Sequence, residues 1–226
     1  MLTTRWLPKV LAVCTLLTFG AGLAAGFDFW TNKDGTGDFF EWRDGGSDHG
    51  LFGDPILVNG NTFVFFPDGF RAQSVNGVLD VISDRMEVEL IASPGYMFTD
   101  VLISEYGDYG IFDEGMVAVT GSLFVTRLND EFKVLSDDLV SDPPSPIDSG
   151  HGTWTGEVGI DLSAQFPVWT RLKLVLDDNL IALSAPGSIS FIEKKVLGAG
   201  LSITIIPEPA SLILLLGGVA LIRRYR

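Results

Sequence analysis

The chain has almost no cysteine. Of its 226 residues only Cys14 carries a thiol, and Cys14 lies within an N-terminal apolar run at 10–19. Removal of that run on export leaves no disulfide, no thiolate nucleophile and no cysteine metal ligand. Val13 stands where a lipoprotein signal needs a small residue, so we expect no lipid on Cys14. The stability of the mature protein must then come from its core.

Basic residues are also scarce. Residues 27–206 hold 28 of the 29 acidic residues but only 10 of the 15 Lys and Arg residues. This balance argues against nucleic acid as a partner, because phosphate binding depends on basic side chains. It also argues against adhesion to anionic membrane surfaces. An acidic surface fits a solvated, exported protein or one that binds divalent cations.

The motifs of common hydrolases are missing. There is no G-x-S-x-G elbow and no H-E-x-x-H zinc motif. Ser47, Asp48 and His49 are adjacent, and adjacent residues rarely face one another as a triad requires. Glu87 and Glu89 lie about 7 Å apart on one strand face, but they do not complete the E-x-D-x-x-E pattern of one jelly-roll glycosidase group. We interpret them as a solvated face and expect a protein that is not an enzyme.

The N-terminus has the layout of a secretory signal peptide. Arg5 and Lys9 precede the apolar run, and the small residues GAGLAAG follow it. These are the three parts of such a signal. Ala24 and Gly26 favour cleavage before Phe27, with cleavage after Ala24 as the alternative. Residues 1–26 are therefore predicted to form a signal helix that is removed on export.

The C-terminus joins a Pro-Glu-Pro triplet to an apolar run and a basic end. Uncharged residues fill 210–222, and the basic cluster Arg223, Arg224 and Arg226 follows. Proline breaks a helix, so the apolar helix begins after the triplet and is shorter than the roughly 20 residues that span a bilayer. Basic residues stay on the cytoplasmic side. The body is therefore expected outside, with the tail as a transient anchor.

These three parts resemble the PEP-CTERM sorting signal of secreted proteins in Gram-negative bacteria, and the resemblance is confined to 207–226. It implies that exosortase, a membrane protease-transpeptidase, processes the tail near Pro207, Glu208 and Pro209. It also implies a precursor anchored in the inner membrane and a mature protein in the periplasm, at the cell surface or in the exopolysaccharide matrix. The alternative is an ordinary C-terminal anchor.

Residues 27–206 are predicted to form one acidic all-β domain. Helical periodicity is hard to find, whereas alternating or short apolar runs recur between turn residues. Asn59-Gly60 marks a hairpin turn. Strands are predicted within 56–66, 86–92, 98–107, 116–128, 153–163, 168–178, 179–185, 188–196 and 199–206. The pattern is typical of an antiparallel β-sandwich of jelly-roll type.

Residues 135–152 interrupt this rhythm with four acids and three prolines. They predict a long surface loop, and a boundary between two smaller domains is the alternative.

The acidic, glycine-rich segment 27–54, which would open the mature chain, is the strongest candidate site. Ca²⁺ takes six to eight oxygen ligands, and glycine turns let backbone carbonyls join carboxylates. The stretch begins like an EF-hand loop, but Thr36 and Arg43 occupy ligand positions, so it is not one. The candidate Ca²⁺ ligands are Asp34, Asp38, Asp44 and Asp48, and a solvated loop is the alternative.

Trp30, Trp42, Trp154 and Trp169 remain after export. Core packing is the usual role of such residues, and a platform for sugar rings is the alternative. The sequence favours a non-enzymatic protein of the cell surface or exopolysaccharide matrix. A carbohydrate- or Ca²⁺-binding module in the same place is the second reading. A secreted glycoside hydrolase is the third, which a pair of carboxylates in one concave cleft would support.

Overall fold

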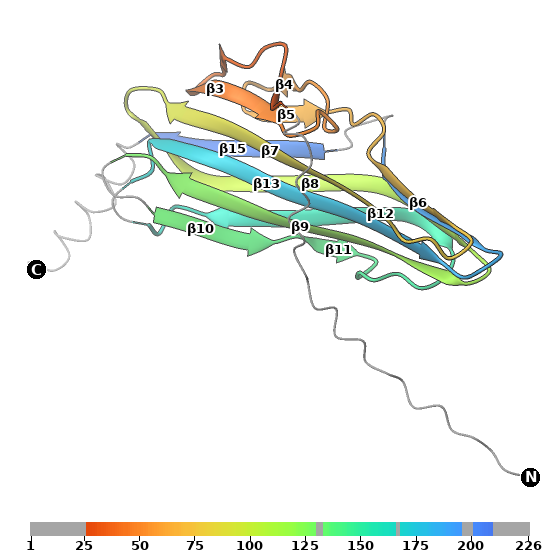
Figure 1. Cartoon of the computed structure of the whole chain (residues 1–226). Helices are drawn as coiled ribbons and strands as arrows, with labels where there is room; N and C mark the ends of the chain where they lie inside the picture. Colours follow the sequence, from red (N-terminus) through yellow and green to blue (C-terminus); the bar gives the residue numbers. More distant parts are fainter. Residues whose placement is uncertain (1–25, 130–132, 166–167, 196–200, 210–226) are drawn as a thin grey trace, which may run out of the picture.

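The computed structural model describes residues 26–129, 133–165 and 168–195, and the backbone of 201–209. These residues form two antiparallel sheets that pack face to face (Figure 1). The predicted all-β sandwich is therefore confirmed. The signal helix and the apolar tail helix both lie outside the described residues. Within the described part, no helix has the length and apolarity needed to cross a membrane.

The first sheet has seven strands in the order β1-β3-β7-β13-β9-β10, and β2 also pairs with β3. Its strands are β1 (Asp28–Phe29), β2 (Gly35–Thr36), β3 (Phe40–Ser47), β7 (Asp80–Ala92), β9 (Gly115–Arg127), β10 (Lys133–Asp138) and β13 (Arg171–Ser184). The long strands β7, β13 and β9 form its centre (Figure 1).

The second sheet has eight strands in the order β11-β12-β8-β15-β5-β4, and β14 pairs with both β6 and β8. Its strands are β4 (Ile56–Val58), β5 (Thr62–Phe65), β6 (Arg71–Val75), β8 (Tyr96–Phe112), β11 (Val140–Asp142), β12 (His151–Asp161), β14 (Ile189–Lys194) and β15 (Leu201–Pro209). β8 pairs with β12 along one edge and with β15 and β14 along the other.

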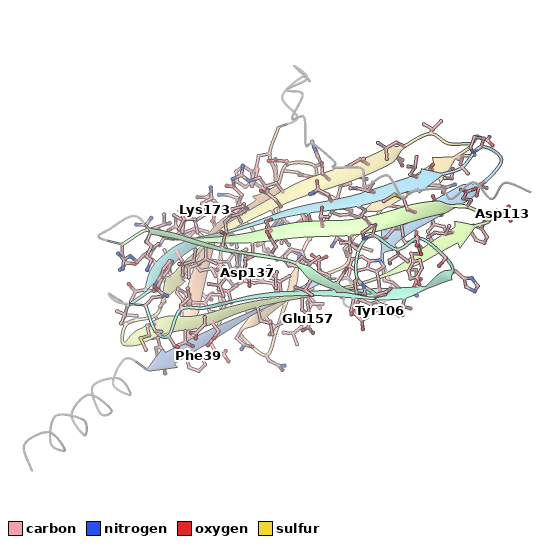
Figure 2. The ribbon with its side chains drawn as sticks, turned by 90° about the horizontal axis from the view of Figure 1, so that it is seen from below. Phe39, Tyr106, Asp113, Asp137, Glu157 and Lys173 are labelled. Atoms are coloured by element: carbon pink, nitrogen blue, oxygen red, sulfur yellow. The ribbon has the colours of Figure 1, made fainter. Side chains whose placement is uncertain are left out.

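The core lies between the two sheets, where alternate side chains of each strand meet. Met86, Val88 and Leu90 of β7 are at most 1% exposed, which confirms the alternation predicted for 86–92. Trp154 of β12 is fully buried from the opposite layer. Figure 2 shows the two layers with their side chains between them, Lys173 on one layer and Tyr106 on the other.

The β4–β5 hairpin turns where the sequence places it. Asn59 and Gly60 have φ values of 52° and 68°. Two successive left-handed residues match the twist of a tight hairpin, and Asn-Gly tolerates them best.

Two strand predictions are wrong. Residues 168–178 and 179–185 were expected to be separate strands, but β13 runs unbroken through Asp177, Asp178 and Asn179. The structure accommodates this polar triplet because Asp178 finds a partner in the core. Residues 135–152 are not one loop either, since they contain most of β10, all of β11 and the start of β12. This segment leads from an edge of one sheet to an edge of the other, and the chain on either side of it contributes to both sheets.

The predicted sorting triplet continues the last strand. The backbone of Pro207, Glu208 and Pro209 pairs with Phe98, Met97 and Tyr96 of β8, after a register shift at Ile206/Pro207. The folded domain therefore extends to the triplet itself. Arg223, Arg224 and Arg226 lie outside the described residues.

Candidate binding groove

A row of polar side chains crosses the outer face of the seven-stranded sheet. Ser122 of β9 lies opposite Asp138 of β10 on one side and Asp177 of β13 on the other. Asp177 in turn lies opposite Arg85 of β7. Asp48 follows β3, and its backbone N–H donates to the carbonyl of Arg85 at 3.0 Å. From β10 to β7 this row spans about 14 Å at the usual strand spacing.

Two adjoining cavities follow this row, and we call them together the cross-sheet groove. The larger has a volume of about 560 Å³ and lies between β9, β13 and the segment 138–145. The smaller, of about 320 Å³, lies between β7, β13 and the turn after β3. Asp177 and Asn179 line both. Other hydrogen-bonding side chains that line the groove are Asp48, His49, Ser83, Asp84, Arg85, Thr120, Ser122, Asp138, Ser141, Ser145 and Asp178.

Asp177 is a partly buried carboxyl of the groove. Partial burial raises its pKa, Arg85 opposes the rise, and the charges of Asp48 and Glu87 add to it. The Arg85 guanidinium lies 3.5 Å from the Asp177 carboxylate and 2.9 Å from that of Glu87. Among the side chains that line the groove, the carboxylates of Asp48, Asp138 and Asp177 outnumber the guanidinium of Arg85, so the groove is acidic. It therefore repels anions and offers both donors and acceptors to a neutral, hydroxylated ligand.

Asp84 fixes the wall of the groove that follows β3. Its side chain is buried and accepts hydrogen bonds from Ser47 Oγ at 2.9 Å and from the backbone N–H groups of His49 and Leu51 at 2.9 and 2.8 Å. A buried carboxylate is tolerated only when such donors replace water. Asp84 therefore holds the turn 47–51 against β7 and positions Asp48.

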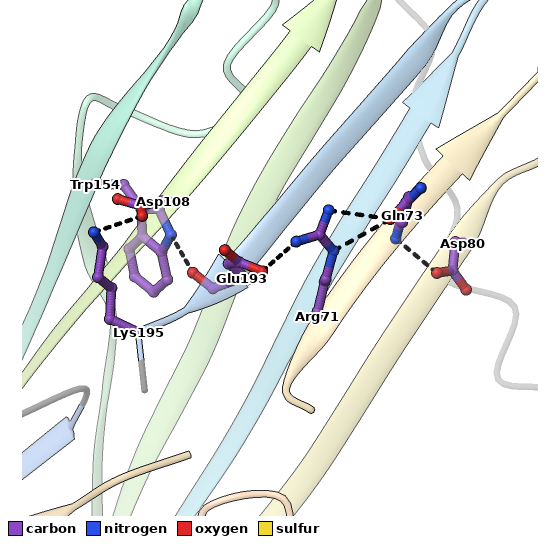
Figure 3. A network of polar contacts seen from close by, with 7 residues as sticks. All are labelled: Arg71, Gln73, Asp80, Asp108, Trp154, Glu193 and Lys195. Carbon is purple, nitrogen blue, oxygen red and sulfur yellow. Dashed lines mark hydrogen bonds and ion pairs between the residues drawn. The ribbon is translucent and has the colours of Figure 1, made fainter. Parts of the chain in front are cut away.

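The outer face of the opposite sheet carries a second set of polar residues (Figure 3). Glu193 of β14 lies between Asp108 of β8 and Arg71 of β6. Arg71 contacts Glu193 at 2.5 Å, and Lys195 contacts Asp108 at 2.6 Å. These charges satisfy one another, as Ser122 Oγ does in the groove by donating to Asp138 Oδ1 at 2.7 Å. The two cavities described above lie along the groove, so this face is the weaker candidate for a ligand.

The four candidate Ca²⁺ ligands are not brought together. Asp34 and Asp44 both pair with Lys33, at 3.2 and 3.1 Å. A hydrogen bond from the backbone of Asp44, and then Lys33, lower the pKa of Asp34. Asp38 lies beside the β4–β5 turn, whereas Asp48 lines the groove. In the described part of the chain, no group of three or more His, Cys, Asp and Glu side chains is placed to hold a metal ion.

The remaining candidates occupy ordinary structural positions. Glu87 and Glu89 form ion pairs on the outer face of the seven-stranded sheet, the latter with Arg171 at 2.7 Å. This agrees with their interpretation as a solvated face.

The tryptophans pack in or against the core. Trp30, Trp154 and Trp169 are at most 5% exposed. The half-buried Trp42 packs against the core and donates to the carbonyl of Asn32 at 3.0 Å. Trp30, Trp154 and Trp169 are therefore closed to sugar rings, whereas Trp42 lines an open hollow beside Asp34 and Asp44.

Sequence analysis singled out Asp48 and His49 but missed the rest of the groove. Asp138 lay in the predicted loop, and Asp177 and Asn179 lay at the adjoining ends of two predicted strands. The signal that could have found them is the alternation along β13. Asp177 and Asn179 lie on the same outward-facing side of this strand as Arg171 and Lys173.

No family model and no curated protein matches the chain. Among solved structures, the chain is similar to the carbohydrate-binding module TmCBM61 in complex with β-1,4-galactotriose, with 12% identity over 80% of this chain and 99% of that one, at a TM-score of 0.26. It is also similar to the enzymatically active domain of tailspike protein 4 of bacteriophage CBA120, with 9% identity, 60% and 19% coverage and a TM-score of 0.24. Likenesses this weak do not bear on function.

Proposed function

We propose that this chain is an exported protein whose β-sandwich binds a neutral polysaccharide in the cross-sheet groove. The supporting observation is the polar row from Asp138 through Ser122 and Asp177 to Arg85, along two cavities that share Asp177 and Asn179 as lining residues. Sugar hydroxyls both donate and accept hydrogen bonds, and the row alternates acceptors with donors in the same way. Its extent suits several sugar residues in line.

Binding is tested with variants of the two residues that line both cavities. Asn179→Ala and Asp177→Ala are each expected to weaken, by about tenfold, binding to a neutral polysaccharide that the wild-type protein binds. Each substitution removes polar contacts worth on the order of 1 kcal/mol or more. The measurement is a glycan array followed by titration calorimetry. Thr153→Ala, an exposed change on β12 of the opposite sheet, is the matched control. Equal binding by all three variants and the wild type would place the ligand elsewhere.

A hydrolase is the second candidate, because Asp138 and Asp177 line one concave groove. They lie two strands apart, about 9.5 Å between backbones, and inverting glycosidases separate their carboxyls by about 6.5–9.5 Å. Burial raises the pKa of Asp177, as a general acid requires. Release of reducing ends from the bound polysaccharide, abolished in Asp177→Asn, would establish hydrolysis. Binding without release supports the module.

The tail is proposed to direct the protein to the cell envelope or matrix through exosortase, as the sorting resemblance implies. The mature protein recovered from its native envelope and medium is expected to begin near Phe27 and to end near the Pro207-Glu208-Pro209 triplet. Intact mass measurement checks both ends at once. A mass that runs through Arg226 would instead identify an ordinary membrane anchor.

A further inference from the structure

Three charged side chains meet in the core of the sandwich. Lys194, at the end of β14, contacts the carboxylates of Glu105 on β8 and Asp178 on β13 through its Nζ atom. All three side chains are fully buried. Lys194 and Glu105 belong to the eight-stranded sheet and Asp178 to the seven-stranded sheet, so the contact bridges the two layers.

Aromatic rings surround the lysine. Its Nζ atom lies 5.2 Å from the ring centroid of Phe70, 5.4 Å from that of Trp154 and 6.0 Å from that of Phe52. These rings are at most 1% exposed. Asp178 Oδ1 and Glu105 Oε1 have no hydrogen-bond partner among the described residues. The site therefore holds an amine against two buried carboxyl groups beneath aromatic rings, with Asp178 at the floor of the smaller cavity of the groove.

Burial acts to lower the pKa of Lys194, but the charges of Asp178 and Glu105 outweigh it and raise that pKa. For the carboxyl groups, burial favours the neutral form. Burial and the neighbouring Asp178 raise the pKa of Glu105 to about 8, against the opposing effect of Lys194. Glu105 therefore carries a proton at neutral pH. Transfer of a proton from the Lys194 ammonium to Asp178 would leave an amine beside two carboxylic acids, and low polarity lowers the cost of that transfer.

We propose that Lys194 and Asp178 become joined by an intramolecular amide bond that cross-links the two sheets, with Glu105 as the proton-transfer group. The Lys194 amine attacks Cγ of Asp178, and the C–N bond forms. Glu105, which is protonated, donates its proton to the departing Asp178 hydroxyl, so that the C–O bond breaks and water leaves. The Glu105 carboxylate then takes the excess proton from the nitrogen and is restored to its acid form. The ammonium and the carboxylate together lose one water, and no oxidant or further reactant is required.

The cross-link accounts for two features of the chain. A buried ion pair costs more desolvation than it usually recovers, and amide formation removes both charges. The mature chain, if cleaved as proposed, contains no cysteine, so a covalent tie between its sheets cannot be a disulfide. The fold preorganises the reaction, because it holds the Lys194 amine in contact with the Asp178 carboxyl, so the two groups need not meet by diffusion.

Mass spectrometry of the folded full-length protein tests the cross-link. The intact protein is expected to be one water lighter than its sequence. Trypsin cuts after free lysine, so an acylated Lys194 should yield the peptide 174–195, uncut after Lys194 and one water lighter. Because Asp178 and Lys194 lie within that peptide, the loss stays inside it. Cleavage after Glu193 should then leave its two pieces joined.

Variants assign the roles. Glu105→Gln keeps the side-chain shape and is expected to retain full mass, or to lose water at least tenfold more slowly. Asp178→Ala is expected to retain full mass. Lys195→Arg changes the adjacent lysine, which faces outward to Asp108 (Figure 3), and should cross-link like the wild type.

Two results would overturn the proposal, and both are read on the wild-type protein without any variant. A tryptic peptide that ends at Lys194 at full mass would show that no bond forms. A link between peptide 86–127, which holds Glu105, and peptide 174–195 would make Glu105 the acyl partner and refute the assignment to Asp178.

Discussion

Lys194→Met is expected to lower the free energy of unfolding by about 3–5 kcal/mol, the usual cost of removing one partner from a buried ion pair. The methionine fills similar space, so the loss comes from the carboxyl groups of Glu105 and Asp178, which keep no cation. No other basic side chain of the described residues contacts them in a salt bridge. Loss of the proposed cross-link adds to the effect, so the figure is a lower bound for the cross-linked protein.

Urea unfolding, followed by tryptophan fluorescence, measures this change, because Trp154 and Trp169 are buried. Lys195→Met is the matched control. Lys195 pairs with Asp108 near the surface, where solvent screens the interaction, and its loss should leave the midpoint almost unchanged. Replacing Lys194, Glu105 and Asp178 together by apolar residues should recover much of the stability of the single variant. A Lys194→Met midpoint equal to that of the wild type would show that the triad contributes nothing.

The free energy of unfolding is expected to fall as pH rises from about 4.5 to about 8. The reason is that the pKa of Glu105 is 4.5 in the unfolded chain and is raised to about 8 in the folded one. Within this window the folded state holds a proton that the unfolded state has released. The free energy of unfolding therefore falls by on the order of 1.4 kcal/mol for each unit by which the pH rises. The contribution is fully present below pH 4.5 and is lost above pH 8. Burial is the largest cause of the shift, so its direction holds whether or not Lys194 and Asp178 are joined.

Denaturant midpoints between pH 4.5 and 8.5 check this slope. Glu105→Gln removes the titrating group and should flatten the profile in that window. Exposed carboxyls with lowered pKa values, such as Asp34 and Asp161, act in the opposite direction and only at more acidic pH. A wild-type profile as flat as that of Glu105→Gln would mean that Glu105 is ionised in the folded protein.

The sequence alone was sufficient for the fold class. Strand alternation is local, so Met86, Val88 and Leu90 could be assigned to the core before any partner strand was known. The Asn59-Gly60 turn could be assigned for the same reason, since its backbone preference belongs to the two residues themselves. The acidic balance could be read in the same way, because it depends on composition rather than on packing. The sorting role of the tail stays a prediction.

Only the tertiary structure revealed the two sites. The groove depends on strand register, which places Ser122 between Asp138 and Asp177 although these residues are far apart in the chain. Asp178 lies on the same inward-facing side of β13 as Leu174 and Leu176. In the sequence, a carboxylate at such a position indicates the end of a strand unless the cation that pairs with it is known. That cation, Lys194, comes from the other sheet. Alternation along a strand determines which side of the sheet each residue faces. The packing of the two sheets determines which charged group of the opposite sheet that residue meets.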